Sequence, residues 1–405
     1  MQKFLFTASM MYFAGGLATV ITGSVLPPLL LHYHLSYTVG GQHVFAQFIG
    51  FLLGVPAAAT LLHRVGFKAL LSVAQLVVGL ALCSISLLPP IWVVATASVL
   101  TGLGVAAAET AAATMIMERF VGRRAVAMSY LEVGFGLGAL VMPSVASLLI
   151  AHQSWRWSFL VAGAVAITTA IAWLLVPSAL TSADDGPDPS MDAPASTQGW
   201  IRIDRRWLLG LFLLLIFLYV GLESSLSSFL PALFIPYLHV SASTASTSVS
   251  VLWLAMVLGR VATGWMVRKV SYPRFLFWSM TGTLVFLMAL TFDRTALPSY
   301  ASVFAIGLFM SGIYSITMVF ANHALPGSPR LVTSLVTVFA GIGGAVLPAG
   351  VGYAMDHVAP AQVVWMLASL ALLLLITLAI ILVLSAMDRK HQADASTCAP
   401  SDAVY

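Results

Sequence analysis

The sequence predicts an all-α membrane protein with twelve transmembrane helices, arranged as two six-helix halves. Three observations lead to this prediction. Apolar residues make up 60% of the 405-residue chain and charged residues 8%, with a mean hydropathy of +0.99, whereas soluble domains carry roughly 25% charged residues. Twelve apolar stretches are long enough to cross a bilayer, which takes about 20 helical residues each. A pattern in the first half of the chain also recurs in the second half.

The expected spans follow one another closely along each half. The first apolar run resembles a secretory signal peptide, but it is too long and lacks a convincing small-residue cleavage site, so we expect a helix that stays in the membrane. The twelve spans are expected at residues 4–31, 41–62, 68–88, 91–117, 125–151, 156–176, 207–235, 243–267, 274–292, 298–322, 331–354 and 361–386.

A polar segment separates the sixth and seventh spans. Residues 178–200 are rich in Asp, Pro, Ser and Gly and show no helical periodicity, which is typical of a flexible linker. The chain therefore divides into an N-terminal half (1–177), a linker (178–206), a C-terminal half (207–387) and a tail (388–405). We expect the tail to be disordered.

The positive charges are unevenly distributed over the two sides of the membrane. If both termini are cytoplasmic, fifteen Lys and Arg residues lie on that side, and only Arg156 and Arg294 lie on the other. This asymmetry places both termini in the cytoplasm, with the protein in the inner or plasma membrane. It also accounts for the net charge of +4, so we expect no nucleic-acid partner.

The repeat relates the two halves at a constant offset of 205 residues. Gly54 to Phe67 pairs with Gly259 to Tyr272, and Gly136 to Pro143 pairs with Gly341 to Pro348. Two matches at one offset indicate duplicated halves in the same orientation. Parallel halves with a binding site between them are typical of transporters.

Three carboxylates, Glu109, Glu132 and Glu223, lie inside apolar spans. A charge at the membrane centre costs at least about 2.5–3.5 kcal/mol, so such residues are protonated, paired or facing a polar cavity. Glu109 and Glu132 flank one loop, about 13 Å and 12 Å from the same membrane face at 1.5 Å per residue. We expect them at similar depth on neighbouring helices, sharing a proton. The alternative is that a carboxylate only bonds a neighbouring helix.

Glu223 lies about 24 Å along the seventh span, nearer the outer face, beside a group of serines. Polar and aromatic residues of other spans are further candidates for substrate binding, because amides bond hydroxyls and aromatic rings stack on sugars. These candidates are Gln47, Gln75, Tyr219, Trp253 and Tyr314, of which we expect two or three to line the pathway. Arg260, near the end of span eight, is predicted to form a gating salt bridge or to bond carbonyls at a helix end.

The chain resembles the major facilitator superfamily over nearly its full length, and within it the fucose–galactose–proton symporter branch. The motifs that carry the resemblance are Glu109-Thr110-Ala111-Ala112 after Gly102-Leu-Gly, Tyr219-Val220-Gly221, Gly259-Arg260 with Thr263-Gly264, and Gly341 to Pro348. The resemblance implies a proton-coupled sugar transporter in which the glutamate of the first motif, Glu109, binds the proton.

The chain departs from that branch at several functional positions. Gly23 stands where the branch has an acidic residue of the first span, and Ala113-Thr114 replaces an Asn-Pro pair. Glu132 and Glu223 fall at positions where the branch carries glutamines. These differences weaken an assignment to fucose and leave room for another polar or cationic substrate.

The predicted function is secondary active transport of a small polar solute, sugar-like in the first instance, by alternating access. Glu109 and Glu132 are the predicted proton-coupling residues. Proton-driven efflux of hydrophobic or cationic compounds is the main alternative, and a non-transporting membrane receptor is a third. No nucleophile context, phosphate-binding loop or metal-ligand spacing is found, and the two cysteines, Cys83 and Cys398, form no framework. We therefore expect no enzyme activity and no cofactor, with the lipid bilayer, protons and a substrate as partners of a monomer.

Overall fold

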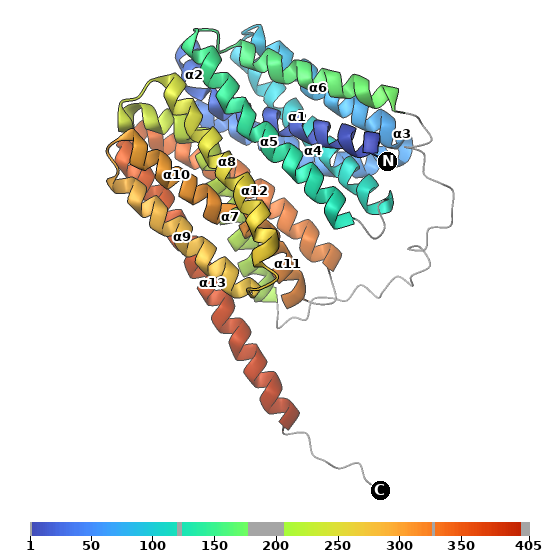
Figure 1. The fold of residues 1–405 in the computed structure, drawn as a ribbon, viewed down its shortest axis with the longest axis vertical. Coiled ribbons are helices and arrows are strands. Elements are labelled where there is room, and N and C mark those ends of the chain that lie inside the picture. The colour runs from blue at the N-terminus through green and yellow to red at the C-terminus, as the bar shows by residue number, and fades with distance from the viewer. Residues whose placement is uncertain (1, 120–123, 177–205, 326–328, 398–405) are drawn as a thin grey trace.

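The computed structural model describes residues 2–119, 124–176, 206–325 and 329–397. The N-terminal half contains six helices: α1 (Gln2–Ser24), α2 (Leu26–Tyr33), α3 (Tyr37–Ser86), α4 (Ile91–Arg119), α5 (Arg124–Ala151) and α6 (Trp157–Leu175). The C-terminal half contains α7 (Arg206–Leu238), α8 (Ala242–Met266), α9 (Tyr272–Phe292), α10 (Ala296–Met310), α11 (Ile313–Ala324), α12 (Pro329–His357) and α13 (Pro360–Thr397). Figure 1 shows the two halves as neighbouring helical bundles.

The described residues contain eleven helical stretches long and apolar enough to cross a membrane. One of them, α3, has 50 residues and turns at Gly66, which has φ 75° and ψ 167°. This backbone conformation is essentially restricted to glycine. An unbroken helix of this length would measure about 75 Å, far more than one crossing. The turn therefore gives two spans, and the prediction of twelve transmembrane helices in two six-helix halves is confirmed.

Two expected spans are interrupted by a break in the helix. The first is divided at Val25, and the Pro27–Pro28 pair begins α2, because proline fits the first turn of a helix but not its interior. The tenth span is divided between α10 and α11 at Ser311 and Gly312. Such breaks leave backbone groups without their helical partners.

The structure differs from the prediction in the C-terminal tail and leaves most of the predicted linker outside the described residues. We expected disorder after Asp388, but α13 continues to Thr397 and extends beyond the bundle in Figure 1. The reason is local, because good helix formers follow Asp388 and no proline occurs between Asp388 and Pro400. Most of the predicted linker, and the final residues of the tail, lie outside the described residues.

The halves contact each other through two equivalent pairs of helices. α5 packs against α8, and α12 packs against the first part of α3. A Cβ atom added at Gly136 would lie 2.6 Å from Val257, and one at Gly341 would lie 2.5 Å from Leu52. These two contacts are related by the 205-residue offset of the sequence repeat. The duplication thus appears in space as a pseudo-twofold interface.

Candidate functional site

A cavity of about 270 Å³ lies between the two halves. Its wall includes both apolar and polar side chains, and four of these are charged. Its lining residues are Tyr12, Thr19, Val20, Thr22, Val44, Gln47, Phe48, Phe51, Gly102, Val105, Glu109, Glu132, Phe135, Val220, Glu223, Ser224, Ser227, Ser228, Trp253, Arg260, Tyr314, Thr337, Ala340 and Gly341. Helices α1, α3, α4, α5, α7, α8, α11 and α12 contribute to it.

The sequence repeat also organises this wall. Six pairs of lining residues are related by the 205-residue offset: Thr19 and Ser224, Thr22 and Ser227, Phe48 and Trp253, Glu109 and Tyr314, Glu132 and Thr337, and Phe135 and Ala340. The pseudo-twofold axis therefore passes through the cavity. The pairs differ in chemistry, because the two acids of the N-terminal half have hydroxyl-bearing counterparts in the C-terminal half. The two halves thus contribute equivalent positions to the wall, but the charge of these positions is asymmetric.

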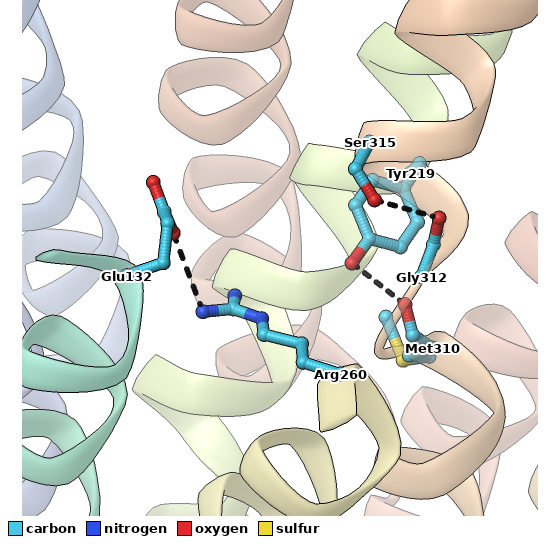
Figure 2. Close-up of polar contacts among 6 residues, drawn as sticks. All are labelled: Glu132, Tyr219, Arg260, Met310, Gly312 and Ser315. Atoms are coloured by element: carbon cyan, nitrogen blue, oxygen red, sulfur yellow. Dashed lines mark hydrogen bonds and ion pairs between the residues drawn. The ribbon is translucent and has the colours of Figure 1, made fainter. Parts of the chain in front are cut away.

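An ion pair connects the halves across the cavity. Arg260 of α8 places its Nη1 atom 3.6 Å from Oε2 of Glu132 on α5, as Figure 2 shows. The guanidinium also lies 5.6 Å from the ring centroid of Trp253, a favourable cation–π distance. The Glu132 side chain is 54% exposed and the Arg260 side chain 29% exposed, so the pair remains accessible from the cavity.

Glu109 is enclosed more tightly than Glu132. Its Oε1 atom is buried and has no hydrogen-bond partner in the described part of the chain. A Cβ atom at Gly15 of α1 would lie 3.1 Å from this oxygen, so the glycine leaves space for the carboxylate. The Tyr12 hydroxyl donates to the Glu109 backbone carbonyl at 3.1 Å.

Glu109 and Glu132 were expected on neighbouring helices, and in the structure α1 lies against both of these helices. α5 packs along α1 and makes few contacts with α4. α1 approaches α5 closely because glycines on both helices face the partner backbone; a Cβ at Gly16 would lie 2.1 Å from the Phe135 carbonyl oxygen. Both acids nevertheless line the same cavity.

Three of the five further candidates line the cavity. Gln47 donates from Nε2 to the Ala18 carbonyl at 3.1 Å, which fixes its amide at the wall. Trp253 is 4% exposed, and its ring packs edge-on to Phe135 at 5.8 Å. Tyr314 lies two residues after the α10–α11 break.

Two predicted substrate-binding residues, Gln75 and Tyr219, do not line this cavity. Gln75 is buried between spans and accepts a hydrogen bond from Thr169 at 3.3 Å. The Tyr219 hydroxyl donates to the Met310 carbonyl at 3.0 Å, as Figure 2 shows. Met310 ends α10, so this bond satisfies a carbonyl left free by the helix break. The polar groups of Gln75 and Tyr219 form hydrogen bonds to neighbouring helices. Their positions in the sequence did not predict this role.

The sequence interpretation missed several lining residues, including Tyr12, Phe135 and Thr337. The repeat contained a signal for one of them, since Thr337 is the offset counterpart of Glu132. No comparable signal marked Tyr12, whose place depends on how α1 packs between α4 and α5.

Serines join the halves on one side of the cavity. We call the face where α1 begins and α13 ends the terminal face, and the other end of the bundle the opposite face. Toward the opposite face, the Ser144 and Ser250 hydroxyls lie 2.8 Å apart, and those of Ser147 and Ser243 lie 3.0 Å apart. Both pairs join α5 to α8.

A carboxylate completes this contact at the opposite face itself. Asp356, near the end of α12, accepts hydrogen bonds from the backbone N–H groups of Tyr37 and Thr38 at 2.9 and 2.7 Å, and from the Thr38 hydroxyl at 2.5 Å. The carboxylate thus caps the N-terminus of α3 in the other half. We call this contact the Asp356 latch. It lies beyond the cavity residues Val44 and Gln47 of α3, and it joins the two halves at the opposite face.

Comparison with known proteins agrees with this architecture. The family model of the Major Facilitator Superfamily matches residues 8–292 and 212–399. The glucose/mannose transporter GlcP of Bacillus subtilis (strain 168) is 27% identical over 350 residues, 85% of this chain and 86% of that protein. The TsgA homolog of Buchnera aphidicola subsp. Baizongia pistaciae is 23% identical over 210 residues, half of each protein.

Solved structures share the fold at low sequence identity. A bacterial homolog of the human lysosomal transporter Spinster, in an inward-facing and unoccupied conformation, superposes with a TM-score of 0.71 at 16% identity and 95% coverage of both chains. The nucleoside transporter NupG, as a mutant, gives a TM-score of 0.75 at 10% identity, covering 93% of this chain and 99% of that chain.

The fold and the central cavity define a multi-pass membrane transporter with a small-molecule substrate rather than an enzyme. The chain belongs to the Major Facilitator Superfamily. Its similarity to GlcP confirms the predicted resemblance to sugar-transporting members.

Proposed function

We propose that the protein is a proton-coupled transporter of a small, sugar-like polar solute that works by alternating access. The observation that carries this proposal is the cavity between the duplicated halves, lined by Glu109, Glu132, Glu223 and Arg260. A site at the interface of two repeats can be exposed to either side by rocking of one half against the other. GlcP is a glucose/mannose transporter, which makes hexoses the first substrates to test.

The sidedness follows from the charge distribution. With both termini in the cytoplasm, as the positive-inside rule predicts, the opposite face is extracellular. The Asp356 latch and the serine pairs then close the extracellular side, and the described conformation faces inward. An outward-facing state requires these contacts to separate.

Glu109 is the proposed proton carrier. An unpaired carboxylate enclosed between helices is expensive in a membrane, and binding a proton removes that cost. Glu132 lies in the same cavity but has a partner in Arg260, 3.6 Å away on the other half. A proton or substrate that neutralises Glu132 would release Arg260, so this ion pair is suited to sense occupancy and to act as the gate. Gln47, Trp253, Tyr314 and Glu223 are the proposed substrate contacts.

Reconstitution into proteoliposomes tests the proposal. Addition of glucose or mannose under an imposed pH gradient is expected to produce sugar-dependent proton flux and accumulation of the sugar. Glu109→Gln is expected to abolish accumulation and to retain counterflow exchange, because exchange needs binding and reorientation but no net proton movement. Asp293→Asn is the matched control, since Asp293 bonds Ser302 outside the cavity.

Each alternative function predicts a different result. Loss of both accumulation and counterflow in a folded Glu109→Gln protein would refute the coupling role. Proton flux with cationic drugs alone would identify efflux, which the apolar and aromatic parts of the cavity wall also permit. Binding without flux would identify a receptor.

A further inference from the structure

The cavity has more acidic than basic groups. Among the described residues that line it, the charged side chains are Glu109, Glu132, Glu223 and Arg260. The one guanidinium forms its ion pair with Glu132. Glu109 is assigned above to the proton. Glu223 therefore remains as the third carboxylate. It has neither an ion-pair partner, as Glu132 has in Arg260, nor a proposed proton, as Glu109 has.

The surroundings of Glu223 do not neutralise it. No Lys or Arg side chain of the described chain lies within 4 Å of its carboxylate, although Arg260 is near enough to interact at longer range. Tyr219, one helical turn away, also lies within reach. The Tyr219 hydroxyl donates to the Met310 carbonyl and is also close enough to Glu223 for a hydrogen bond, but it carries no positive charge. Glu223 therefore presents a negatively charged hydrogen-bond acceptor to the cavity.

A second, independent feature lies one helical turn beyond Glu223 on the same face of α7. Ser227 is only 8% exposed and lines the cavity, and its Oγ atom has no hydrogen-bond partner within the described residues. A buried polar atom of this kind normally has a partner. The backbone here is also fixed, because a Cβ atom at Gly23 of α1 would lie 2.5 Å from the Ser227 carbonyl oxygen. The hydroxyl is thus held at the wall with a free bonding position.

Trp253 supplies a third group with an unused donor. Its Nε1 atom is buried and has no hydrogen-bond partner in the described structure. Phe135 and Arg260 hold the ring from two directions, at 5.8 and 5.6 Å. A ring fixed in this way offers an indole N–H to a hydroxyl and an apolar face to the carbons of a sugar.

We infer that the cavity binds a sugar that carries a protonated amine, with the ammonium group at Glu223 and Ser227 and ring hydroxyls at Trp253 and Gln47. This inference rests on the proposed transport function and narrows its substrate class. An ammonium has three donors and one positive charge, which match a carboxylate and a hydroxyl oxygen one turn apart. A neutral sugar would leave Glu223 without a counter-charge. A large multivalent cation would meet Arg260 in a cavity of about 270 Å³.

The test compares three probes of similar shape on the purified full-length protein: glucosamine, glucose and N-acetylglucosamine. Glucosamine carries the ammonium, and the other two are neutral. Inhibition constants are measured by competition for labelled sugar binding, and counterflow is measured in proteoliposomes. Glucosamine is expected to bind about tenfold or more tightly than either neutral sugar, as for a hydrogen bond between charged groups.

The variants separate charge recognition from a general loss of the site. Glu223→Gln is expected to weaken glucosamine binding about tenfold or more while changing glucose binding less than about threefold. Ser227→Ala is expected to weaken glucosamine selectively by a smaller factor, and it tests the same subsite if Glu223→Gln does not fold. Asp293→Asn, which removes a charge outside the cavity, is expected to change neither constant.

Two negative results have distinct meanings. If glucose binds as tightly as glucosamine, or if Glu223→Gln weakens all three sugars equally, the ammonium site is refuted and proton-coupled sugar transport stands. If none of the three sugars binds or moves, the proposed function fails, and this inference fails with it.

Discussion

The Asp356 latch gives the most direct prediction about the transport cycle. The carboxylate of Asp356 accepts three hydrogen bonds from Tyr37 and Thr38 of the other half. In the proposed alternating-access cycle these bonds exist only while the opposite face is closed, because the two halves must separate there for the face to open. Asp356→Ala therefore destabilises one conformation and leaves the other nearly unchanged.

The size of the effect follows from the number and exposure of the bonds. Hydrogen bonds to charged groups contribute about 1.5–3 kcal/mol each, and ordinary ones about 0.5–1.5 kcal/mol. The latch is exposed, so solvent screening justifies the lower range. Three bonds at about 1 kcal/mol each give roughly 3 kcal/mol, or about a 100-fold shift toward the state with an open opposite face.

Distance measurements between spin labels can follow this shift. Labels at Gln153 and Leu297 report on the opposite face, since both residues are exposed and belong to different halves. The native Cys83 and Cys398 are first replaced by Ser. Asp356→Ala is expected to add or enlarge a population at longer distance.

The neighbouring residue His357 provides the control. Its ring stacks on Tyr353 at 4.0 Å and contacts that residue's carbonyl within the same helix, so His357→Ala is expected to leave the distance distribution unchanged. The reasoning is refuted if Asp356→Ala also leaves it unchanged, or if the two substitutions have equal effects.

Three substitutions test the packing that positions the site, the first two by thermal unfolding of the purified protein and the third by the yield of folded protein. Tyr219→Phe leaves the carbonyl at the end of α10 without its donor and is expected to cost about 1–3 kcal/mol; an unchanged melting temperature would contradict this role. Gly66→Ala places a side chain at φ 75° and is expected to cost about 1–3 kcal/mol, while no loss would mean that the turn relaxes freely. Gly102→Ala would bring a Cβ atom 1.8 Å from the Gln47 carbonyl oxygen and is expected to lower the yield of folded protein severely, whereas Gly264→Ala, with no atom within 4 Å, is expected to be tolerated; equal effects would refute the close approach.

Much of the fold was predictable because the membrane acts on local sequence. A bilayer requires about 20 apolar residues for each crossing and leaves no backbone group unpaired, so the spans could be found one at a time. The turn at Gly66 and the break before Pro27 also have local causes. The break at Gly312 does not, because it depends on the Tyr219 hydroxyl and on the close contact of α8, to which residues far apart in the chain contribute.

The candidate site was predictable only in part. Buried carboxylates are costly wherever they occur in a span, so Glu109, Glu132 and Glu223 could be recognised without a structure. Gln75 and Tyr219 belonged to the same set of polar candidates, yet they face other helices. The hydropathy of the sequence predicts which residues lie within a membrane span. The direction in which a side chain points depends on which helices surround it.

The sequence by itself therefore determined the class of protein, the number of spans, the duplication and the acids that the membrane cannot leave unpaired. Only the tertiary structure decided that α1 lies between the helices of Glu109 and Glu132, that Arg260 meets Glu132 across the two halves, and that Asp356 joins the halves at the opposite face. The physical reason is the range of the forces involved. Transfer into lipid acts on each segment separately, whereas close packing and ion pairs join segments more than a hundred residues apart.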